Sequence, residues 1–399
     1  MRVAIDTRSL RPPLAGIGHF THRLTEAMLP LLSRDETLLA FNGWALELLD
    51  RQFLNRIAAA NSGNGAMSSQ RAARQAGRKL YNALRPVAAV RKGVRAVQAH
   101  RFRRHEQRFD VFHAINYVPP GKSRGPVLPF IHDLSHIRHP KMHPRDRVEW
   151  LQEQLAHVAD APLVQTNSQF SKGEITAVLG IPAERIYVTY AAPGADFRRA
   201  PDGDEVWLAK NALTARRFIL AVGTREPRKN FKSVAEAYVG LPENLRAQIP
   251  LVWCGPAGWG DLSLSPSAAR AKGAGQIRIA GYVPDRELAA LYRNCTLFVM
   301  ASVYEGFGMP VVEAMACGAR IALSRIPIFE EIAGDYARYV EPLDVEEWGR
   351  AIREAVEEAR DSSGLQLRQP DLVRFSWQSS AAATLDLYRQ LRRLAWGVS

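Results

Sequence analysis

The chain carries two successive series of short apolar runs, and stretches with helical spacing separate each run from the next. The first series has its runs at residues 3–6, 38–41, 111–114, 127–131 and 163–166. The second has them at residues 218–222, 251–254, 277–280, 297–301, 321–323 and 339–340. Strands that alternate with helices form parallel sheets covered on both faces. The sequence therefore predicts an α/β protein of two Rossmann-like domains, with ligand bound in the cleft beyond the carboxyl ends of the strands.

The composition is that of an ordinary globular protein. Hydrophobic residues make up 47% and charged residues 23% of the 399-residue chain, within the usual range. There is no apolar run of about 18 residues, and Met1 leads directly into a strand-like run without a signal-peptide pattern. Cys254, Cys295 and Cys317 stand alone in apolar contexts, so we expect reduced core thiols in a cytoplasmic protein.

The most specific motif lies at residues 304–318, YEGFGMPVVEAMACG, directly after an apolar run. It sets Glu305 and Glu313 on either side of a glycine-rich turn that opens a helix near Pro310. Glycines let the backbone approach a ligand, and the free amides of a helix start attract anions. Each carboxylate can accept hydrogen bonds from neighbouring sugar hydroxyls. The same acids also fit a plain helix start or the carboxylate pair of a glycoside hydrolase.

This block resembles the E-x7-E signature of the family 4 retaining glycosyltransferases, which have the GT-B fold. The resemblance implies that Glu305 contacts the transferred hexose and that Glu313 binds the ribose hydroxyls of a nucleotide sugar. It also implies that the residues between them contact the donor, namely Gly306, Phe307, Gly308, Met309 and Pro310.

A basic turn follows the first run of the second series, at residues 220–230, LAVGTREPRKN. Arg228 and Lys229 at the end of a strand can neutralise the charge that develops on a departing diphosphate, without a metal. The alternative, a basic helix start, is disfavoured by the helix dipole. The segment resembles the V-G-T-x-E-P-R-K-N motif of the same family, which implies catalytic roles for both cations and donor contacts from Gly223 and Thr224.

His132 and Asp133 follow the run 127–131. At a strand end they can bind sugar hydroxyls or act as an acid–base pair, although such a pair is often only structural. Their position matches the H-D pair of family 4 enzymes, which implies that they lie at the reaction centre. His136, His139 and His143 lack the spacing of a zinc site, so we expect them to shape the acceptor cleft and expect no metal.

Two further segments carry the resemblance along the chain. The turn LAGIGHF at residues 14–20 precedes an expected helix at 21–29 and resembles the first loop of bacterial mannosyl- and rhamnosyltransferases. It implies donor-phosphate contacts from Gly16 and Gly18, although G-x-G alone is a weak signal. The segment at 280–288 resembles the family's base-reading strand end, which implies that Tyr282 and Val283 flank the nucleotide base.

The formal net charge of +13 is concentrated between residues 71 and 108, a stretch that contains twelve Lys or Arg residues and a single acidic residue, Glu106. Apolar residues recur among them at helical spacing, and such a basic amphipathic segment binds anionic membranes with about 1 kcal/mol per basic residue. A solvated helical insertion fits the same pattern equally well. A nucleic-acid-binding role is weaker, because aromatic platforms and a binding motif are missing.

The polar stretch 194–204 is the best domain boundary. We expect an acceptor-binding domain at 1–198, a nucleotide-sugar-binding domain at 205–375, and a C-terminal helix at 376–399 that the resemblance places back on the first domain. DGD at residues 202–204 spells a metal-binding D-x-D but falls in the expected linker.

The predicted function is the transfer of a hexose, namely mannose or rhamnose, from a GDP-sugar to a hydroxyl group of a glycan, with retention of the anomeric configuration. The expected acceptor is a polyprenyl-diphosphate-linked oligosaccharide of a bacterial surface polysaccharide such as O-antigen, at the inner face of the cytoplasmic membrane. A UDP-hexose donor stays open. The alternatives are a GT-B sugar phosphorylase or epimerase, a glycoside hydrolase, and a basic nucleic-acid-binding protein.

Overall fold

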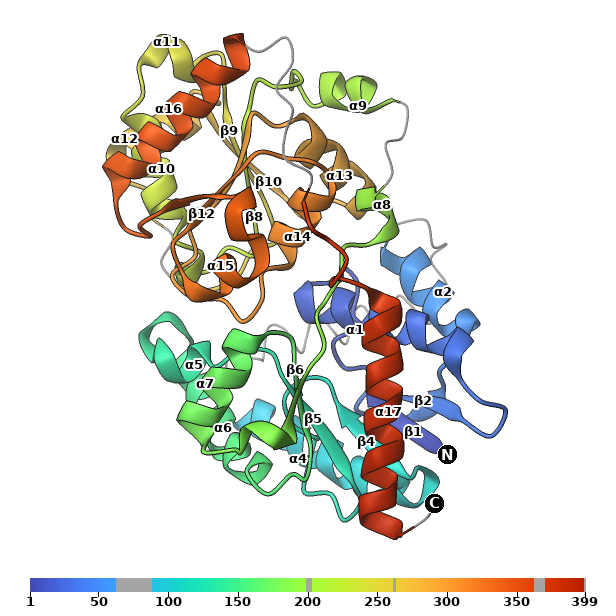
Figure 1. Cartoon of the computed structure of the whole chain (residues 1–399). Coiled ribbons are helices and arrows are strands. Elements are labelled where there is room, and N and C mark those ends of the chain that lie inside the picture. The colour runs from blue at the N-terminus through green and yellow to red at the C-terminus, as the bar shows by residue number, and fades with distance from the viewer. Residues whose placement is uncertain (62–87, 199–202, 261–262, 362–369, 398–399) are drawn as a thin grey trace.

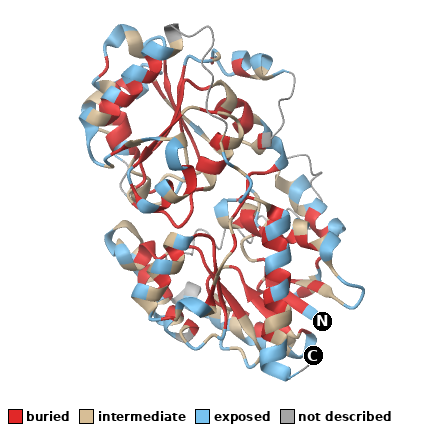
Figure 2. Ribbon diagram, viewed as in Figure 1, coloured by how far each residue is buried: buried red, intermediate tan, exposed pale blue. Residues whose placement is uncertain are grey.

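A computed structural model of the chain describes residues 1–61, 88–198, 203–260, 263–361 and 370–397. Two α/β domains face each other with a cavity between them, and the last helix returns to the first domain (Figure 1). The strands form the buried centre of each domain, with helices on both sides (Figure 2). The predicted fold class is therefore confirmed.

The sheet of the first domain has the order β3-β2-β1-β4-β5-β6-β7, and every neighbouring pair is parallel except β2 with β3. The sequence missed β3 and β7, because each is only three residues long and half-exposed. The strands are β1 (Arg2–Asp6), β2 (Thr37–Phe41), β3 (Leu46–Leu48), β4 (Val111–Ala114), β5 (Val127–Ile131), β6 (Val164–Thr166) and β7 (Ile186–Val188).

Helices cover both faces of this sheet. Side chains of α1 and α17 pack with Val3, Ile5 and Phe130 on one face, whereas Phe102 of α4 packs with Ala4 and Phe112 on the other. The α-helices are α1 (Gly16–Met28), α2 (Arg51–Asn61), α4 (Ala88–His105), α5 (Ser135–Arg138), α6 (Arg145–Leu155) and α7 (Gln169–Leu179). Short 3-10 turns are η1 (Leu29–Leu31), η2 (Glu106–Arg108), η3 (Pro140–Met142), η4 (Ala156–Val158) and η5 (Ala183–Arg185).

The sheet of the second domain is wholly parallel, in the order β10-β9-β8-β11-β12-β13. Its strands are β8 (Ile219–Val222), β9 (Leu251–Cys254), β10 (Ile277–Gly281), β11 (Leu297–Met300), β12 (Ile321–Ser324) and β13 (Arg338–Val340). Its helices are α8 (Ala195–Arg198), α9 (Asp204–Lys210), α10 (Phe231–Val239), α11 (Glu243–Arg246), α12 (Pro266–Gly273), α13 (Asp285–Asn294), α14 (Met309–Ala316), α15 (Pro327–Ala333) and α16 (Val345–Asp361), with 3-10 turns η6 (Pro227–Lys229) and η7 (Gly334–Tyr336).

Helix α17 (Trp377–Trp396) lies along α1, β4 and β5 of the first domain (Figure 1). Its buried face carries polar anchors as well as apolar side chains. The hydroxyl of Tyr388 and Nδ1 of His113 are 2.6 Å apart, and Nε2 of Gln165 donates to Oγ1 of Thr384 at 2.7 Å. The C-terminal helix thus fixes the end of the second domain's chain to the first domain.

The basic segment 71–108 falls outside the described residues up to residue 87, and the structure describes its part from residue 88 onward. In that part, helix α4 exposes Lys92, Arg101, Arg103 and Arg104, and Arg95 stacks over the ring of Trp150 at 4.5 Å. Across the ranges described, no helix is long and apolar enough to cross a membrane.

Candidate active site

A cavity of about 540 Å³ lies between the two domains, where the carboxyl ends of both sets of strands meet. All seventeen residues that the sequence singled out line this cavity. They are His132, Asp133, Arg228, Lys229 and Glu305 of the predicted catalytic set, and Gly16, Gly18, Gly223, Thr224, Tyr282, Val283, Gly306, Phe307, Gly308, Met309, Pro310 and Glu313 of the predicted donor-binding set.

The turn between β11 and α14 forms one wall. Gly308 ends the turn with φ +110° at the N-terminus of α14, a conformation that favours glycine. Pro310 occupies the first turn of the helix, where a missing N–H costs nothing. The glutamates therefore flank a turn and a helix start, as predicted, with Glu305 buried before the turn and Glu313 half-buried on the helix.

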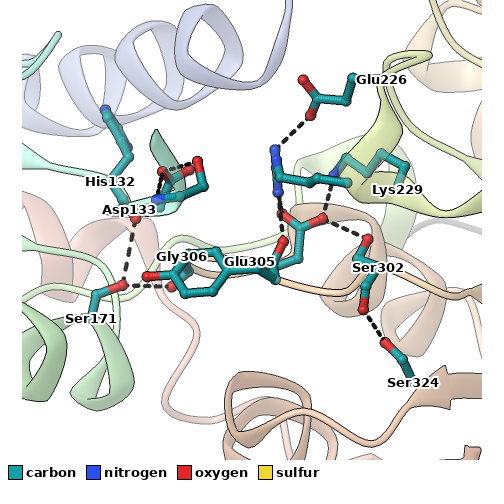
Figure 3. A network of polar contacts seen from close by, with 12 residues as sticks. His132, Asp133, Ser171, Glu226, Lys229, Ser302, Glu305, Gly306 and Ser324 are labelled. Carbon is teal, nitrogen blue, oxygen red and sulfur yellow. Dashed lines mark hydrogen bonds and ion pairs between the residues drawn. The ribbon is translucent and has the colours of Figure 1, made fainter. Parts of the chain in front are cut away.

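Glu305 joins both predicted cations in one network (Figure 3). Its Oε2 accepts a hydrogen bond from Nη1 of Arg228 at 2.5 Å, and its Oε1 accepts one from Nζ of Lys229 at 2.5 Å. Oε1 also accepts a hydrogen bond from Oγ of Ser302 at 2.7 Å. Glu305 therefore pairs with both cations of η6.

Glu226 is a further member of this network that the sequence did not single out. Its Oε1 lies 2.7 Å from Nη2 of Arg228, and its side chain is buried. Burial alone would lower the pKa of Arg228, but the charges of Glu305 and Glu226 raise it. The pKa of Glu305 is lowered, since Arg228 and Lys229 outweigh the effect of burial. Arg228 is thus a permanent cation between two carboxylates.

His132 and Asp133 follow β5 on the opposite wall. Nε2 of His132 donates to the carbonyl of Ile115 at 2.7 Å, and burial lowers the pKa of this imidazole to about 4. The ring is therefore neutral near pH 7, with Nδ1 as a hydrogen-bond acceptor. Burial opposes ionisation of Asp133, but Arg228 and two hydrogen bonds from Ser135 lower its pKa to about 2. Asp133 is a fixed anion beside a neutral histidine.

The first turn of α7 ties these two walls together (Figure 3). The carbonyl of Gly306 accepts hydrogen bonds from Oγ of Ser168 at 2.7 Å and Oγ of Ser171 at 3.0 Å. Beside it, the carboxylate of Glu331 on α15 accepts backbone N–H bonds from Gln169 and Phe170 at 2.9 and 2.8 Å. A helix N-terminus favours such a negative partner. The first domain therefore holds the second in a closed arrangement at the site.

The glycines of the N-terminal turn lie within a helix, which corrects the prediction that the helix begins at residue 21. Helix α1 starts at Gly16, with Ala15 as its N-cap. A Cβ on Gly18 would approach the carbonyl oxygen of Ser9 to 2.8 Å, whereas one on Gly16 would meet nothing within 4 Å. Gly18 therefore serves packing, and the free amides of the first turn of α1 lie at the cavity, where they can bind an anion.

The far end of the cavity joins α1 and α2 to the loop after β10. Nδ2 of Asn61 donates to the hydroxyl of Tyr282 at 2.9 Å, and Arg23 of α1 pairs with Asp285 of α13. Glu313 lies nearby with the hydroxyl of Tyr292 at 3.4 Å. Burial, helped by the charge of Asp285, raises the pKa of Glu313 to about 8. When ionised, this carboxylate can accept hydrogen bonds from the hydroxyl groups of a ligand, and those bonds offset the cost of burying its charge.

The described residues contain no group of three or more His, Cys, Asp or Glu side chains that could hold a metal ion. His139 packs on Tyr304 and His143 on Trp259, while His136 is buried. Asp204 pairs with Arg293 at 2.8 Å, and Asp202 lies outside the described residues.

The cavity-lining residues that the sequence did not single out include Asn116, Tyr117 and Trp259. Asn116 and Tyr117 come two and three residues after the end of β4, so their place just beyond a strand end was a usable signal. Trp259 lies in the loop after β9 and belongs to no recognised motif, whereas Arg147 in α6 belongs to the stretch H-P-x-x-R-V at residues 143–148, which resembles bacterial polysaccharide mannosyltransferases.

This arrangement can bind both a charged leaving group and sugar hydroxyl groups. Arg228, Lys229 and the amides of α1 suit a diphosphate, and Asp133, Glu305 and Glu313 supply hydroxyl acceptors. Three comparisons with known proteins show which proteins this chain is similar to.

Residues 204–368 match the family model "Glycosyl transferases group 1". The chain is 31% identical to the O-antigen chain mannosyltransferase B of Escherichia coli over 407 aligned residues, which cover 98% of this chain and 100% of that one. Among solved structures, sucrose-phosphate synthase from Thermosynechococcus elongatus superposes with a TM-score of 0.65 at 15% identity, covering 99% of this chain and 100% of that chain. Anabaena HepE in complex with UDP-glucose does so with a TM-score of 0.62 at 15% identity, covering 99% of both chains.

The structural similarities confirm the GT-B fold, and the near-complete alignment with a mannosyltransferase confirms the resemblance on which the sequence analysis relied. The chain belongs to the glycosyl transferases group 1 family and is a glycosyltransferase.

Proposed function

We propose that the protein transfers mannose or rhamnose from a GDP-sugar to a hydroxyl of a lipid-linked glycan, with retention of the anomeric configuration. The observation that carries the proposal is the contact of Glu305 with both Arg228 and Lys229, directly opposite Asp133 and His132 in a cavity that both domains close. Two such cations can stabilise the charge that develops on a diphosphate leaving group, and the carboxylates on both walls can accept hydrogen bonds from the hydroxyls of a transferred hexose.

In the proposed reaction, the donor diphosphate replaces Glu305 as the partner of Arg228 and Lys229. Glu305 and Nδ1 of His132 then accept hydrogen bonds from hexose hydroxyls. An acceptor hydroxyl attacks the anomeric carbon from the face that the diphosphate leaves, and a diphosphate oxygen takes the hydroxyl proton. No protein nucleophile is needed, and the cations carry the charge that develops on the leaving group.

The closed arrangement of the domains supports transfer to a sugar rather than to water. Gly306 and the first turn of α7 bring the two walls together, and Asn61 bridges to Tyr282 at the other end. Excluding water protects an activated donor from hydrolysis.

The choice of donor and acceptor is supported by the relatives. The relative aligned along the whole chain is named an O-antigen chain mannosyltransferase, and a Salmonella typhimurium relative with 27% identity over 48% of this chain carries the same description. Mannose from GDP-mannose, and a growing surface polysaccharide as acceptor, are therefore the first substrates to test.

The exposed basic residues of α4 support peripheral binding to an anionic membrane, where a lipid-linked acceptor resides. Lys92, Arg101, Arg103 and Arg104 are exposed on this helix. Replacing the three arginines by Gln should reduce cosedimentation with phosphatidylglycerol vesicles and leave donor binding unchanged. Vesicle binding that survives this change would remove the membrane from the proposal.

The test of the donor is a panel of GDP- and UDP-sugars in a thermal-shift assay. A ligand at about 100 times its dissociation constant stabilises a protein by about 2.7 kcal/mol, so the right donor should raise Tm clearly. Lys229→Ala should abolish that shift, and Lys232→Ala, an exposed lysine three residues along, should retain it. If no nucleotide sugar shifts Tm, the proposal fails. NMR of the product then reports whether the anomeric configuration is retained.

A further inference from the structure

Three cationic side chains line the cavity, and they differ in their partners. Arg228 pairs with Glu226 and Glu305, and Lys229 pairs with Glu305. The third, Arg147 of α6, forms no ion pair with any carboxylate in the described part of the chain. The positive charge on the second domain's wall is thus balanced within the protein, whereas that of Arg147 is not.

Arg147 is held at the cavity by an aromatic contact across the domain interface. Its guanidinium lies 5.0 Å from the centroid of the Trp259 ring, and the indole N–H of Trp259 donates to the carbonyl of Met142 at 2.9 Å. A guanidinium stacked on an indole keeps its N–H groups free to bind a ligand in the plane of the fork. The half-buried Arg147 is therefore positioned without an acidic partner.

The residues around Arg147 also point to a ligand. Tyr117 lines the same part of the cavity with φ +69°, a strained conformation for a bulky residue that occurs often at functional sites. Burial and Asp133 raise the pKa of Tyr117, and the charges of Arg147 and Arg228 act against them. Both cations therefore act on one phenol, from opposite walls.

The nearest histidines add no charge beside Arg147. His136 and His143 have no hydrogen-bond partner for buried ring nitrogens, and burial lowers the pKa of each to about 4. Both rings are neutral near pH 7. A half-buried cation without an anionic partner is costly, and an anionic ligand removes that cost.

We propose that Arg147 binds a phosphate group carried by the acceptor, so that the enzyme selects acceptors that bear a phosphate ester near the sugar. This inference rests on the proposed function, which supplies the acceptor. Arg147 belongs to the first domain, and the donor diphosphate has its own cations on η6 of the second domain. The anion that meets Arg147 therefore arrives with the other substrate. A guanidinium fork matches phosphate oxygens bidentately.

The test measures binding of farnesyl diphosphate to the full chain by calorimetry. The donor site is first saturated with GDP or UDP, whichever raises Tm, so that the probe does not occupy Arg228 and Lys229. Farnesol is the uncharged comparison. Arg147→Gln should raise the Kd of farnesyl diphosphate about 10- to 100-fold, the range for a lost charged hydrogen bond, and Arg147→Lys should raise it less. Neither variant should change the Kd of the nucleotide.

Arg145→Gln is the matched control, because Arg145 lies on the same helix, is almost fully exposed and pairs with Glu149. It should leave both affinities unchanged. The proposal is overturned if the wild-type chain does not bind farnesyl diphosphate, if Arg147→Gln binds it equally well, or if Arg147→Gln weakens the nucleotide to the same degree. Loss of binding to phosphatidylglycerol vesicles alone would assign Arg147 to a membrane headgroup and also overturn it. If the chain binds no nucleotide sugar, the proposed function fails. That outcome is distinct from failure of this inference, because the affinity for farnesyl diphosphate is measured without turnover.

Discussion

The α-carbon of Gly306 lies against the backbone carbonyl of His132, and a Cβ placed on Gly306 would come within 1.9 Å of that oxygen. The two residues belong to different domains, and each adjoins a predicted catalytic side chain, Glu305 and Asp133. The absence of a side chain at one position thus sets how closely the two walls of the site approach.

Gly306→Ala should hold the domains apart and reduce kcat/KM for transfer at least about 100-fold, because misplacing reacting groups by about 1 Å has an effect of that order. Each domain keeps its own core, so far-UV circular dichroism should be unchanged. Gly173→Ala on α7, where an added Cβ would meet nothing within 4 Å, should retain activity. Wild-type kcat/KM in Gly306→Ala would show that this contact does not set the geometry of the site.

Glu305→Gln should separate nucleotide binding from transfer. Glu305 is the common partner of Arg228 and Lys229, so it would compete with a diphosphate for these two cations. The neutral variant should bind GDP more tightly, by about 10-fold or more, and yet transfer sugar more slowly, because it lacks the carboxylate expected to hold the hexose. Calorimetry and steady-state kinetics check the two effects. Tighter GDP binding with normal turnover would contradict the role of Glu305.

Short motifs that follow buried strands allowed the sequence to predict which residues would lie together at one cavity. Glu305, Arg228 and Asp133 each come just after a parallel strand of the expected pattern, and parallel strands bring their carboxyl ends to one edge. Such positions follow from local order along the chain. Continuous apolar runs also marked the long strands, because both faces of each sheet are covered.

Contacts between segments that are distant in the sequence could not be predicted from the sequence. The approach of Gly306 to His132 and the stacking of Arg147 on Trp259 depend on how the two domains meet, which no local pattern records. The start of α1 was misplaced for another reason. Glycine is disfavoured in helix interiors, so Gly16 and Gly18 indicated a loop. Their backbone nevertheless lies in the first turn of the helix. At Gly18, close packing against the backbone of Ser9 leaves no room for a side chain.

The protein should lose stability on acidification from about pH 6.5 to pH 4. Burial lowers the pKa of His132, His136 and His143 to about 4, and that of His113 to about 3. Over this interval the unfolded chain binds protons that the folded chain does not. The free energy of unfolding therefore decreases as the pH is lowered. Tm measured across the interval should fall steadily. His136→Gln should make the decline shallower, and the same change at the exposed His100 should not. A flat Tm profile would mean that these rings are protonated in the folded state.

Glu313→Gln should stabilise the free enzyme increasingly as pH rises from about 4.5 to 8. The folded-state pKa of Glu313, about 8, lies above its unfolded value, so in this window the folded chain retains a proton that the unfolded chain has lost. Stability therefore falls with rising pH, and an amide removes that loss. The difference in Tm between variant and wild type should grow across the window and level off above pH 8. The KM for the donor should rise about 10-fold, because the amide replaces a charged carboxylate and keeps only one of its two acceptor oxygens for the ribose hydroxyls. Glu346→Gln on the exposed face of α16 should show neither effect, and a Tm difference that does not depend on pH would place the ionised carboxylate in the folded site.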